Sequence, residues 1–283
     1  MDKQELVTII IPVFNRADIL PRAIKSSLSQ TYQNIELIII DDGSTDNIEE
    51  IVKGFRDSRI QYIRFSKNRG ASAARNTGIK SSRGDFIAFL DSDDEYLPEK
   101  IEKSLKIFKG LARNTGMVCS NFWKIEGKEK KLGVHKKIKP NYQFPSISTW
   151  VLQKEVFEKI GLFDERLRAE EDREFMFRFH EFFPFYFIDK PLVIRYGTQA
   201  SLSSNTEEYV RARKIFLEKH FPSFQKKRGF LARQFYRLAK DLYSIGQKEE
   251  ARKYFLKAFI TYPFKAEYLV KFFKAHIKNK HHS

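Results

Sequence analysis

An alternation of strand-like and helix-like apolar patterns over the first 90 residues constrains the fold of this chain more than any other feature. The run VTIIIPV, Val7 to Val13, consists of β-branched residues and one proline, which is typical of a strand buried on both faces of a parallel sheet. Helical spacing follows it, and a second strand-like run, Ile35 to Ile40, stops at Asp41. The pattern repeats at Ile60 to Phe65 and at Asp85 to Leu90. It predicts a doubly wound α/β fold with a mostly parallel sheet flanked by helices.

Polar residues follow each of the four predicted strands. In chain order they are Asn15 and Arg16, Asp41 to Ser44, Asn68 to Gly70, and Asp91 to Asp94. Doubly wound sheets bind their ligands beyond the carboxyl ends of the strands, so this edge is the predicted site. One acidic pair after a strand is also ordinary turn or helix-capping chemistry. Two acidic clusters at one edge favour a binding site.

Length and composition limit the class of protein. The chain has 283 residues, of which 42% are hydrophobic, enough for a large core and for two domains. Its single cysteine, Cys119, excludes a disulfide within the chain and any multi-cysteine metal site, and it favours a reducing compartment. The sequence lacks the features of a secretory signal and of a membrane-spanning segment. We therefore expect a cytoplasmic protein.

The chain falls into three predicted segments. Residues 1–110 and 111–205 are expected to form the two halves of one α/β domain, and residues 206–283 a basic, aromatic-rich helical module. In the second segment, helical periodicity predicts helices over Trp150 to Ile160 and Glu170 to Phe182. Three amphipathic helices are predicted after residue 228, and part of this segment is similar to one tetratricopeptide repeat.

The net charge of +16 is concentrated near the carboxyl terminus. Residues 211–283 contain 19 basic and 5 acidic residues, a net charge of +14. One interpretation is that this segment attaches the protein peripherally to the anionic inner face of the cell membrane. The residues facing lipid would be Tyr268, Phe272, Phe273 and Ile277. The alternative is that these aromatic residues pack inside the protein while the lysines face water.

The triplet Asp91-Ser92-Asp93 is a candidate metal motif. Two carboxylates at positions i and i+2 beyond a strand can point toward one hard divalent cation, which prefers oxygen ligands. Such a cation binds diphosphate groups. The triplet alone is a weak signal, because Asp-x-Asp occurs by chance in many chains.

Ordered motifs around this triplet resemble the nucleotide-sugar domain of inverting family 2 glycosyltransferases, which have the GT-A fold. The motifs are VTIIIPVFNRADILPRAIKSSLSQTYQNIELIIIDDGSTD, NRGASAARNTGI and GDFIAFLDSDDEYLP. A fourth, VFEKIGLFDERLRAEEDREFMFRF from Val156 to Phe179, resembles the acceptor-side helix of the family. The resemblance implies metal-dependent transfer of a sugar from a nucleoside-diphosphate sugar, with UDP preferred, in surface polysaccharide synthesis. The implied acceptor is a hydroxyl of a glycan or of a lipid-linked molecule.

The resemblance also implies roles for individual residues. Those expected to bind the nucleotide sugar are Pro12, Phe14, Asn15, Asp42, Arg75, Asn76, Asp91, Ser92 and Asp94. Asp42 would contact uracil or its ribose, and Arg75 the phosphates. Asp93 and Asp91 would hold Mn2+ or Mg2+, with Asp93 as the more direct ligand, while Asp94 would bind metal or donor sugar.

The acid-base residue is expected at the start of the helix that carries the fourth motif. Asp172 is the candidate base that takes a proton from the acceptor, and Glu171 is the alternative. Two positions depart from the family pattern. Arg173 stands where an aromatic residue is common, and Gly197 stands near the place of a histidine, which leaves a third metal ligand unassigned.

Two other functions compete with this interpretation. An aspartate-nucleophile phosphotransferase would use Asp91 or Asp93, but it would normally carry its Asp-x-Asp after the first strand. A nucleic-acid-binding protein would explain the basic charge but not the acidic sheet edge, which repels phosphate without a cation. We expect no nucleic-acid partner, and the sequence predicts no oligomeric state.

Overall fold

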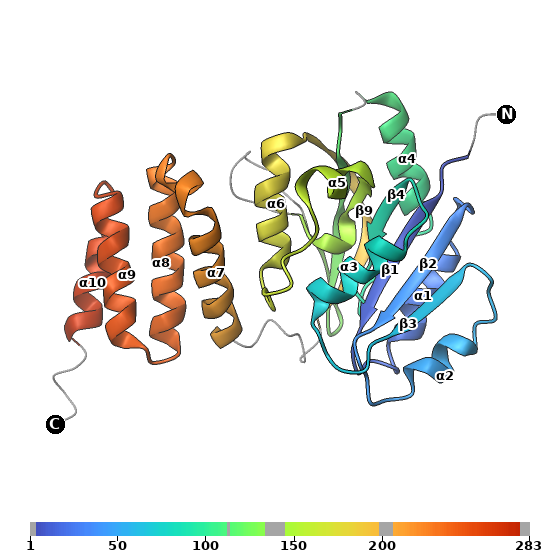
Figure 1. Cartoon of the computed structure of the whole chain (residues 1–283), viewed down its shortest axis with the longest axis horizontal. Helices are drawn as coiled ribbons and strands as arrows, with labels where there is room; N and C mark the ends of the chain where they lie inside the picture. Colours follow the sequence, from blue (N-terminus) through green and yellow to red (C-terminus); the bar gives the residue numbers. More distant parts are fainter. Residues whose placement is uncertain (1–3, 112–113, 134–144, 198–205, 278–283) are drawn as a thin grey trace. The chain divides into compact units, whose positions relative to one another are not determined.

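The computed structural model describes residues 4–111, 114–133, 145–197 and 206–277 (Figure 1). The chain divides into two compact units. The first comprises Met1–Glu165 and Asp172–Gln199, and the second comprises Arg166–Glu171 and Ala200–Ser283. The finer division of the first unit at residue 110 remains a prediction.

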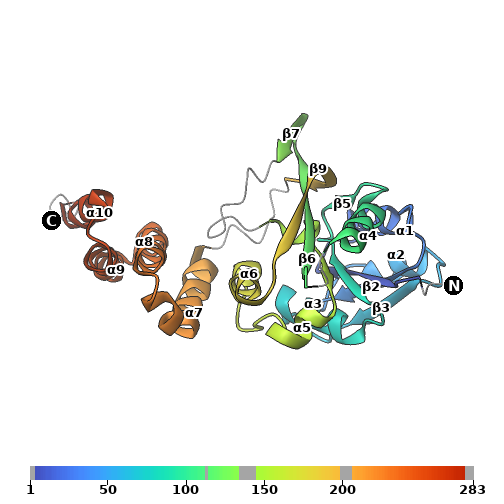
Figure 2. The same ribbon diagram turned by 90° about the horizontal axis from the view of Figure 1, so that it is seen from above.

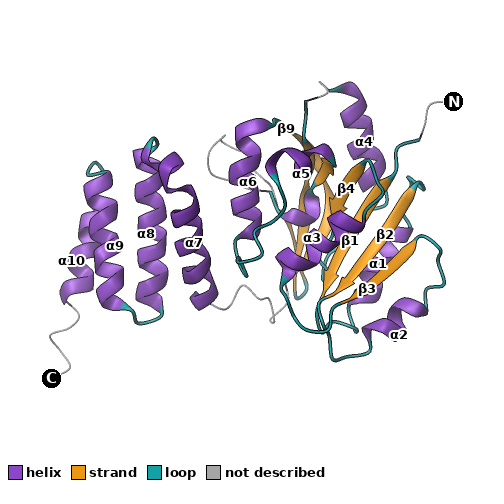
Figure 3. Ribbon diagram, viewed as in Figure 1, coloured by secondary structure: helices purple, strands orange, loops and turns teal. Residues whose placement is uncertain are grey.

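The first unit is built on one sheet, drawn in orange in Figure 3. Its described residues form nine strands in the order β3-β2-β1-β4-β8-β6-β9-β5, and β7 pairs with β6 in a hairpin. Its strands are β1 (Val7–Val13), β2 (Ile35–Asp41), β3 (Ile60–Arg64), β4 (Phe86–Phe89), β5 (Glu95–Tyr96), β6 (Met117–Glu126), β7 (Glu129–Gly133), β8 (Val151–Gln153) and β9 (Phe185–Tyr196). β1 is parallel to its neighbours β2 and β4, β2 is parallel to β3, and β6 is parallel to β9. β8 lies between β4 and β6 and is antiparallel to both. The predicted α/β fold with a mostly parallel sheet is confirmed.

Helices cover both faces of this sheet (Figure 2). They are α1 (Leu20–Leu28), α2 (Ile48–Lys53), α3 (Ala71–Ser81), α4 (Lys100–Gly110), α5 (Glu155–Ile160) and α6 (Glu171–Phe182). One hydrophobic cluster joins Ile9 of β1 to Ile24 of α1 and Leu105 of α4. A second joins Ile10 to Phe175 of α6. Adjacent residues of β1 thus enter opposite cores, which explains why the strand is apolar throughout.

The predicted helix over Trp150 to Ile160 is wrong in its first half. Val151–Gln153 forms strand β8, and the helix begins only at Glu155. Val151 and Leu152 are fully buried because β8 lies in the middle of the sheet. A short apolar run buried on both faces carries no periodicity that separates a strand from a helix.

The second unit contains four helices in its described residues, namely α7 (Thr206–Gln225), α8 (Arg228–Ser244), α9 (Lys248–Thr261) and α10 (Ala266–Ile277). The last three confirm the three amphipathic helices expected from the sequence. A turn with Gly246 at φ +82° joins α8 to α9. Within this unit Arg213 of α7 pairs with Glu170 and Asp241, both at 2.7 Å. Across the described ranges, no helix has the length and apolar character needed to cross a membrane.

Close packing of α3 on β1 predicts a different response of two helical glycines to alanine. In Gly78→Ala the new Cβ would lie 2.6 Å from Cγ2 of Ile10, so we expect the free energy of unfolding to fall by about 1–3 kcal/mol. Gly110, the last residue of α4, is the control, because a Cβ there meets no atom of the described residues within 4 Å. Urea unfolding measures both variants. Equal losses would contradict the close approach of α3 to β1.

Candidate functional site

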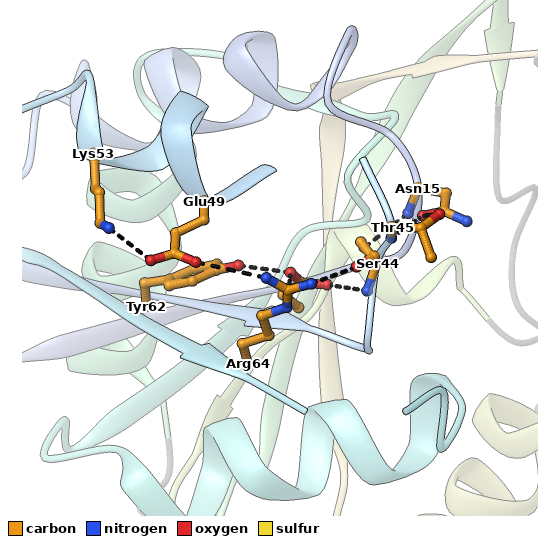
Figure 4. Close-up of polar contacts among 8 residues, drawn as sticks. Asn15, Ser44, Thr45, Glu49, Lys53, Tyr62 and Arg64 are labelled. Atoms are coloured by element: carbon orange, nitrogen blue, oxygen red, sulfur yellow. Dashed lines mark hydrogen bonds and ion pairs between the residues drawn. The ribbon is translucent and has the colours of Figure 1, made fainter. Parts of the chain in front are cut away.

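The carboxyl ends of β1, β2 and β4 place the predicted polar residues at one edge of the sheet. The loop after β1 is tied to the loop after β2 by Asn15, whose backbone N–H donates to the Ser44 hydroxyl at 2.9 Å. In return the Asn15 side-chain oxygen accepts the backbone N–H of Thr45 at 2.8 Å (Figure 4). Asn15 has φ +50°, the left-handed conformation that asparagine tolerates better than most residues. Two segments 30 residues apart are thereby held together.

Asp41 shapes the turn after β2. One of its carboxylate oxygens accepts the Ser44 backbone N–H at 2.8 Å, and the other accepts the Tyr62 hydroxyl at 2.6 Å. Arg64 donates to the carbonyl of Ser44 at 2.7 Å and lies 3.6 Å from Glu49 (Figure 4). These contacts fix the loop that carries Asp42.

Asp42 is buried, and it joins the loop after β2 to the start of α3. Its carboxylate oxygens accept the backbone N–H groups of Arg69 and Gly70 at 2.6 and 2.8 Å. A negative charge at this place also complements the positive end of the α3 helix dipole. Gly43 has φ +78°, and a Cβ there would lie 2.5 Å from the backbone of Lys67, so only glycine fits between these loops.

Three carboxylates gather where β4 ends. Asp91, Asp93 and Asp94 each offer an oxygen within 4.8 Å of the other two. Burial, with the nearby charge of Asp91, raises the pKa of Asp94 to about 7. Hard oxygen donors crowded in this way match the ligand preference of Mg2+ and Mn2+. The cluster therefore fits a divalent cation, with Asp94 as a third carboxylate.

Each of these carboxylates pairs with an arginine from a different element. The pairs are Arg16 with Asp93 at 2.8 Å, Arg75 with Asp91 at 2.9 Å and Arg195 with Asp94 at 3.5 Å. Arg75 is buried on α3, Arg16 follows β1, and Arg195 lies on β9. The arginines offset the repulsion among the carboxylates and bring a concentration of cationic groups to the same place.

Asn76 differs from Pro12 and Phe14 in its surroundings, because it is the buried one of these three residues. The amide of buried Asn76 donates to the Phe163 carbonyl at 2.9 Å and to Glu165 at 3.0 Å, and its oxygen accepts the Phe163 N–H at 2.9 Å. Asn76 therefore holds the loop before α6. Pro12 is half-buried in β1, whereas Phe14 just beyond the strand is exposed.

The candidate base lies in the first turn of α6. Asp172 is half-buried, and one of its oxygens accepts the Arg173 backbone N–H at 2.8 Å. Phe175, one turn later, stacks on Phe163 with 4.7 Å between ring centroids and on Trp150 with 5.9 Å. Trp150 follows the short 3-10 helix η1 (Ile147–Thr149), so aromatic packing connects α6 to the segment beside the acidic cluster.

The sequence did not indicate two buried residues that support this cluster. The Ser148 hydroxyl donates to Asp94 at 2.6 Å and accepts the backbone N–H of Asp91 at 3.2 Å. Lys100 of α4 donates to the Thr149 carbonyl at 2.7 Å and so holds η1 in place, and burial lowers the pKa of Lys100 to about 7. Neither belongs to a recognisable motif. Gly197, which stands near the place of the family histidine, follows β9 directly.

Loss of the Ser148 hydroxyl is expected to destabilise the fold. Ser148→Ala leaves the buried Asp94 without this donor, so the free energy of unfolding should fall by about 1–3 kcal/mol. Ser27→Ala is a matched control, since Ser27 is also fully buried but donates to the carbonyl of Ala23 within its own helix. Urea titration compares the two. A loss for Ser148→Ala no larger than for Ser27→Ala would refute this support of the cluster.

Comparison with solved structures places the fold. S. aureus TarS, residues 1–349 in complex with UDP-GlcNAc, superposes with a TM-score of 0.71, covering 90% of this chain and 81% of that one. The sequence identity is 16%, so the likeness concerns the fold alone. The GT-A fold expected from the sequence is thereby confirmed.

Sequence comparison identifies the family. Residues 8–185 match the model of glycosyl transferase family 2. An uncharacterized glycosyltransferase of Rickettsia prowazekii is 34% identical over 235 residues, which cover 76% of this chain and 72% of that protein. The Escherichia coli protein named UDP-Glc:alpha-D-GlcNAc-diphosphoundecaprenol beta-1,3-glucosyltransferase WfaP is 46% identical over 101 residues, 36% of this chain and 40% of its own. The chain belongs to glycosyl transferase family 2, and it is a glycosyltransferase.

Proposed function

We propose that this enzyme transfers a sugar, with inversion, from a UDP-sugar to a hydroxyl of a glycan or lipid-linked acceptor, in surface polysaccharide synthesis. The observation that carries the proposal is the cluster of Asp91, Asp93 and Asp94 at the carboxyl edge of the sheet, with its paired arginines. The donor and acceptor classes are supported by WfaP and by a second E. coli relative, WfgD, whose names state UDP-Glc and GlcNAc-diphosphoundecaprenol.

Asp93 and Asp91 are proposed to hold Mn2+ or Mg2+, and Asp94 is available as a third ligand. The bound ion would supply positive charge to the diphosphate and so stabilise the leaving group. Ser148 keeps the backbone of Asp91 and the carboxylate of Asp94 in place for this role. Ser92, between the two metal ligands, is assigned to the donor side of the site.

Arginines that now neutralise the carboxylates are proposed to bind the phosphates. Arg16 and Arg75 lie within 3 Å of Asp93 and Asp91. A cation on these carboxylates would compete with the guanidinium groups, which prefer phosphate oxygens as paired acceptors. Arg75 is held by α3, whose neighbouring Asn76 anchors the loop toward α6.

The nucleoside is proposed to lie beside the loops after β1 and β2. Pro12 and Phe14 supply apolar contact. Asn15 joins the loop after β1 to the loop after β2 through its hydrogen bonds to Ser44 and Thr45. Asp42 would contact uracil or ribose through lone pairs other than those that accept the two backbone N–H groups.

Asp172 is proposed as the base, with Glu171 as the alternative. The acceptor oxygen attacks the anomeric carbon as the bond from that carbon to the diphosphate oxygen breaks. The bonding electrons leave with UDP, and the acceptor proton passes to the carboxylate. A single displacement inverts the anomeric centre. The enzyme is also proposed to act at the inner face of the cell membrane.

Removal of the principal metal ligand tests the role of the cluster. In Asp93→Ala we expect the affinity for UDP in the presence of Mn2+ to fall at least tenfold, with a smaller loss in Asp91→Ala. Asp57→Ala is the control, because Asp57 pairs with Arg59 in the loop before β3, away from the cluster. Calorimetric titration measures each affinity. Unchanged UDP affinity in Asp93→Ala would exclude the metal assignment.

Removal of the base is expected to separate binding from transfer. Asp172→Asn should keep the affinity for UDP-sugar, whereas kcat should fall by about 100-fold to 10,000-fold. Glu171→Gln, one residue away, is the matched comparison and should keep most of the activity. Rates are measured by release of UDP with an identified acceptor. A full rate in Asp172→Asn with a lost rate in Glu171→Gln would move the role to Glu171.

A further inference from the structure

Half of the exposed large apolar side chains in the described part of the chain lie in α9, α10 and the turn between them. We call these five residues the α9–α10 stripe: Leu256, Ile260, Phe264, Val270 and Phe273. Phe264 is 86% exposed, Ile260 64% and Phe273 54%. A concentration of exposed apolar side chains marks an interaction surface more often than a solvated one.

Helical spacing places the stripe opposite the core of the second unit. On α9, Leu256 and Ile260 are one turn apart, while Phe255 and Ala258 are buried. The exposed lysines Lys253 and Lys257 each stand one turn from residues of the stripe and flank it. The outer face of α9 therefore combines aliphatic side chains with positive charge.

On α10 the structure corrects the expected set of outward residues. Tyr268 was expected to face lipid, but it is 2% exposed and packs on Tyr236 of α8, with 4.9 Å between ring centroids. Phe273, which the membrane interpretation placed outward, is exposed, Val270 is exposed although it was not in the set, and Phe272 is half-buried. The side chain of Ile277, which entered the same expectation, lies outside what the structure describes.

Charge identifies the partner that fits this surface. Residues 251–277 contain six basic residues and one acidic residue, and Lys265 and Lys271 are exposed beside the stripe. A second copy of this positive surface would be repelled by it. A nucleic acid would use the lysines but would leave the aliphatic side chains exposed.

We propose that the α9–α10 stripe and its lysines form a docking surface for an anionic lipid bilayer. Apolar side chains enter the boundary between headgroups and acyl chains, and lysines bind headgroup phosphates with their stems along the apolar surface. The inference deepens and rests on the proposed function, because a lipid-linked acceptor lies in such a bilayer. The surface itself is defined by the second unit alone.

Flotation of the full-length protein with two kinds of vesicles tests the proposal. Vesicles of phosphatidylcholine alone are compared with vesicles containing about 30% phosphatidylglycerol, an anionic lipid. The protein should float with the anionic vesicles only and should detach as salt rises. Phe264→Ala with Phe273→Ala should abolish flotation. Phe182→Ala with Phe221→Ala, two exposed phenylalanines outside the stripe, should leave it unchanged.

A second pair of variants tests the lysines. Lys265→Gln with Lys271→Gln should lower the ratio of bound to free protein about 30-fold at low salt. Lys106→Gln with Lys109→Gln changes the net charge equally at exposed positions of α4 and should have little effect. Equal losses in the two pairs would show that only bulk charge matters and would overturn the proposed surface.

Other outcomes also contradict the proposal. They are failure of the parent protein to float, equal flotation with both vesicles, and a dimer that dissociates in the Phe264→Ala, Phe273→Ala variant. These readouts need neither donor nor acceptor. If the protein floats but transfers no sugar to a lipid-linked acceptor, the proposed function is rejected and the docking surface is retained. If it transfers sugar but does not float, the docking surface is rejected and the proposed function is retained.

Discussion

Repulsion among three carboxylates at the end of β4 is the constraint on which the site depends. Asp91, Asp93 and Asp94 lie within reach of one ion, and burial raises the pKa of Asp94 to about 7. Such a cluster is stable in a fold only if the surrounding elements supply compensating groups. The loop after β1, helix α3, η1 and strand β9 do so, through three arginines and the Ser148 hydroxyl. Much of the sheet's carboxyl edge can be understood as support for this concentration of negative charge.

The fold makes that support possible because its strand order differs from its chain order. β4 pairs with β1, so the loop after residue 13 lies beside the residues after 89, and Arg16 reaches Asp93. β8 inserts next to β4 and brings η1 to the same edge. Asp42 joins the loop after β2 to α3, the helix that carries Arg75. The supporting residues thus come from four separate segments, which are the loop after β1, helix α3, η1 and strand β9.

The sequence predicted the parts of this arrangement that are local. β-branched runs indicated the first four strands, and the spacing of acids at their ends located the edge and the Asp91–Asp94 cluster. It could not indicate Ser148, because the Ser148–Asp94 bond joins residues 54 positions apart through a strand too short to show periodicity. Lys100 was missed because a lysine in an amphipathic helix ordinarily faces water. The sequence left open whether Tyr268 faces lipid or packs inside the protein, because aromatic residues lie on both sides of α10. The surroundings of Ser148, Lys100 and Tyr268 are determined by long-range pairing and burial rather than by local propensity.

Anomalous diffraction from crystals containing Mn2+ and UDP tests the central claim most directly, since it locates the ion without reference to activity. We predict a manganese peak within about 2.5 Å of a carboxylate oxygen of Asp93, with a second oxygen from Asp91 and with the Arg16 guanidinium moved toward the diphosphate. Bound UDP with no manganese peak at Asp91, Asp93 or Asp94 would contradict it.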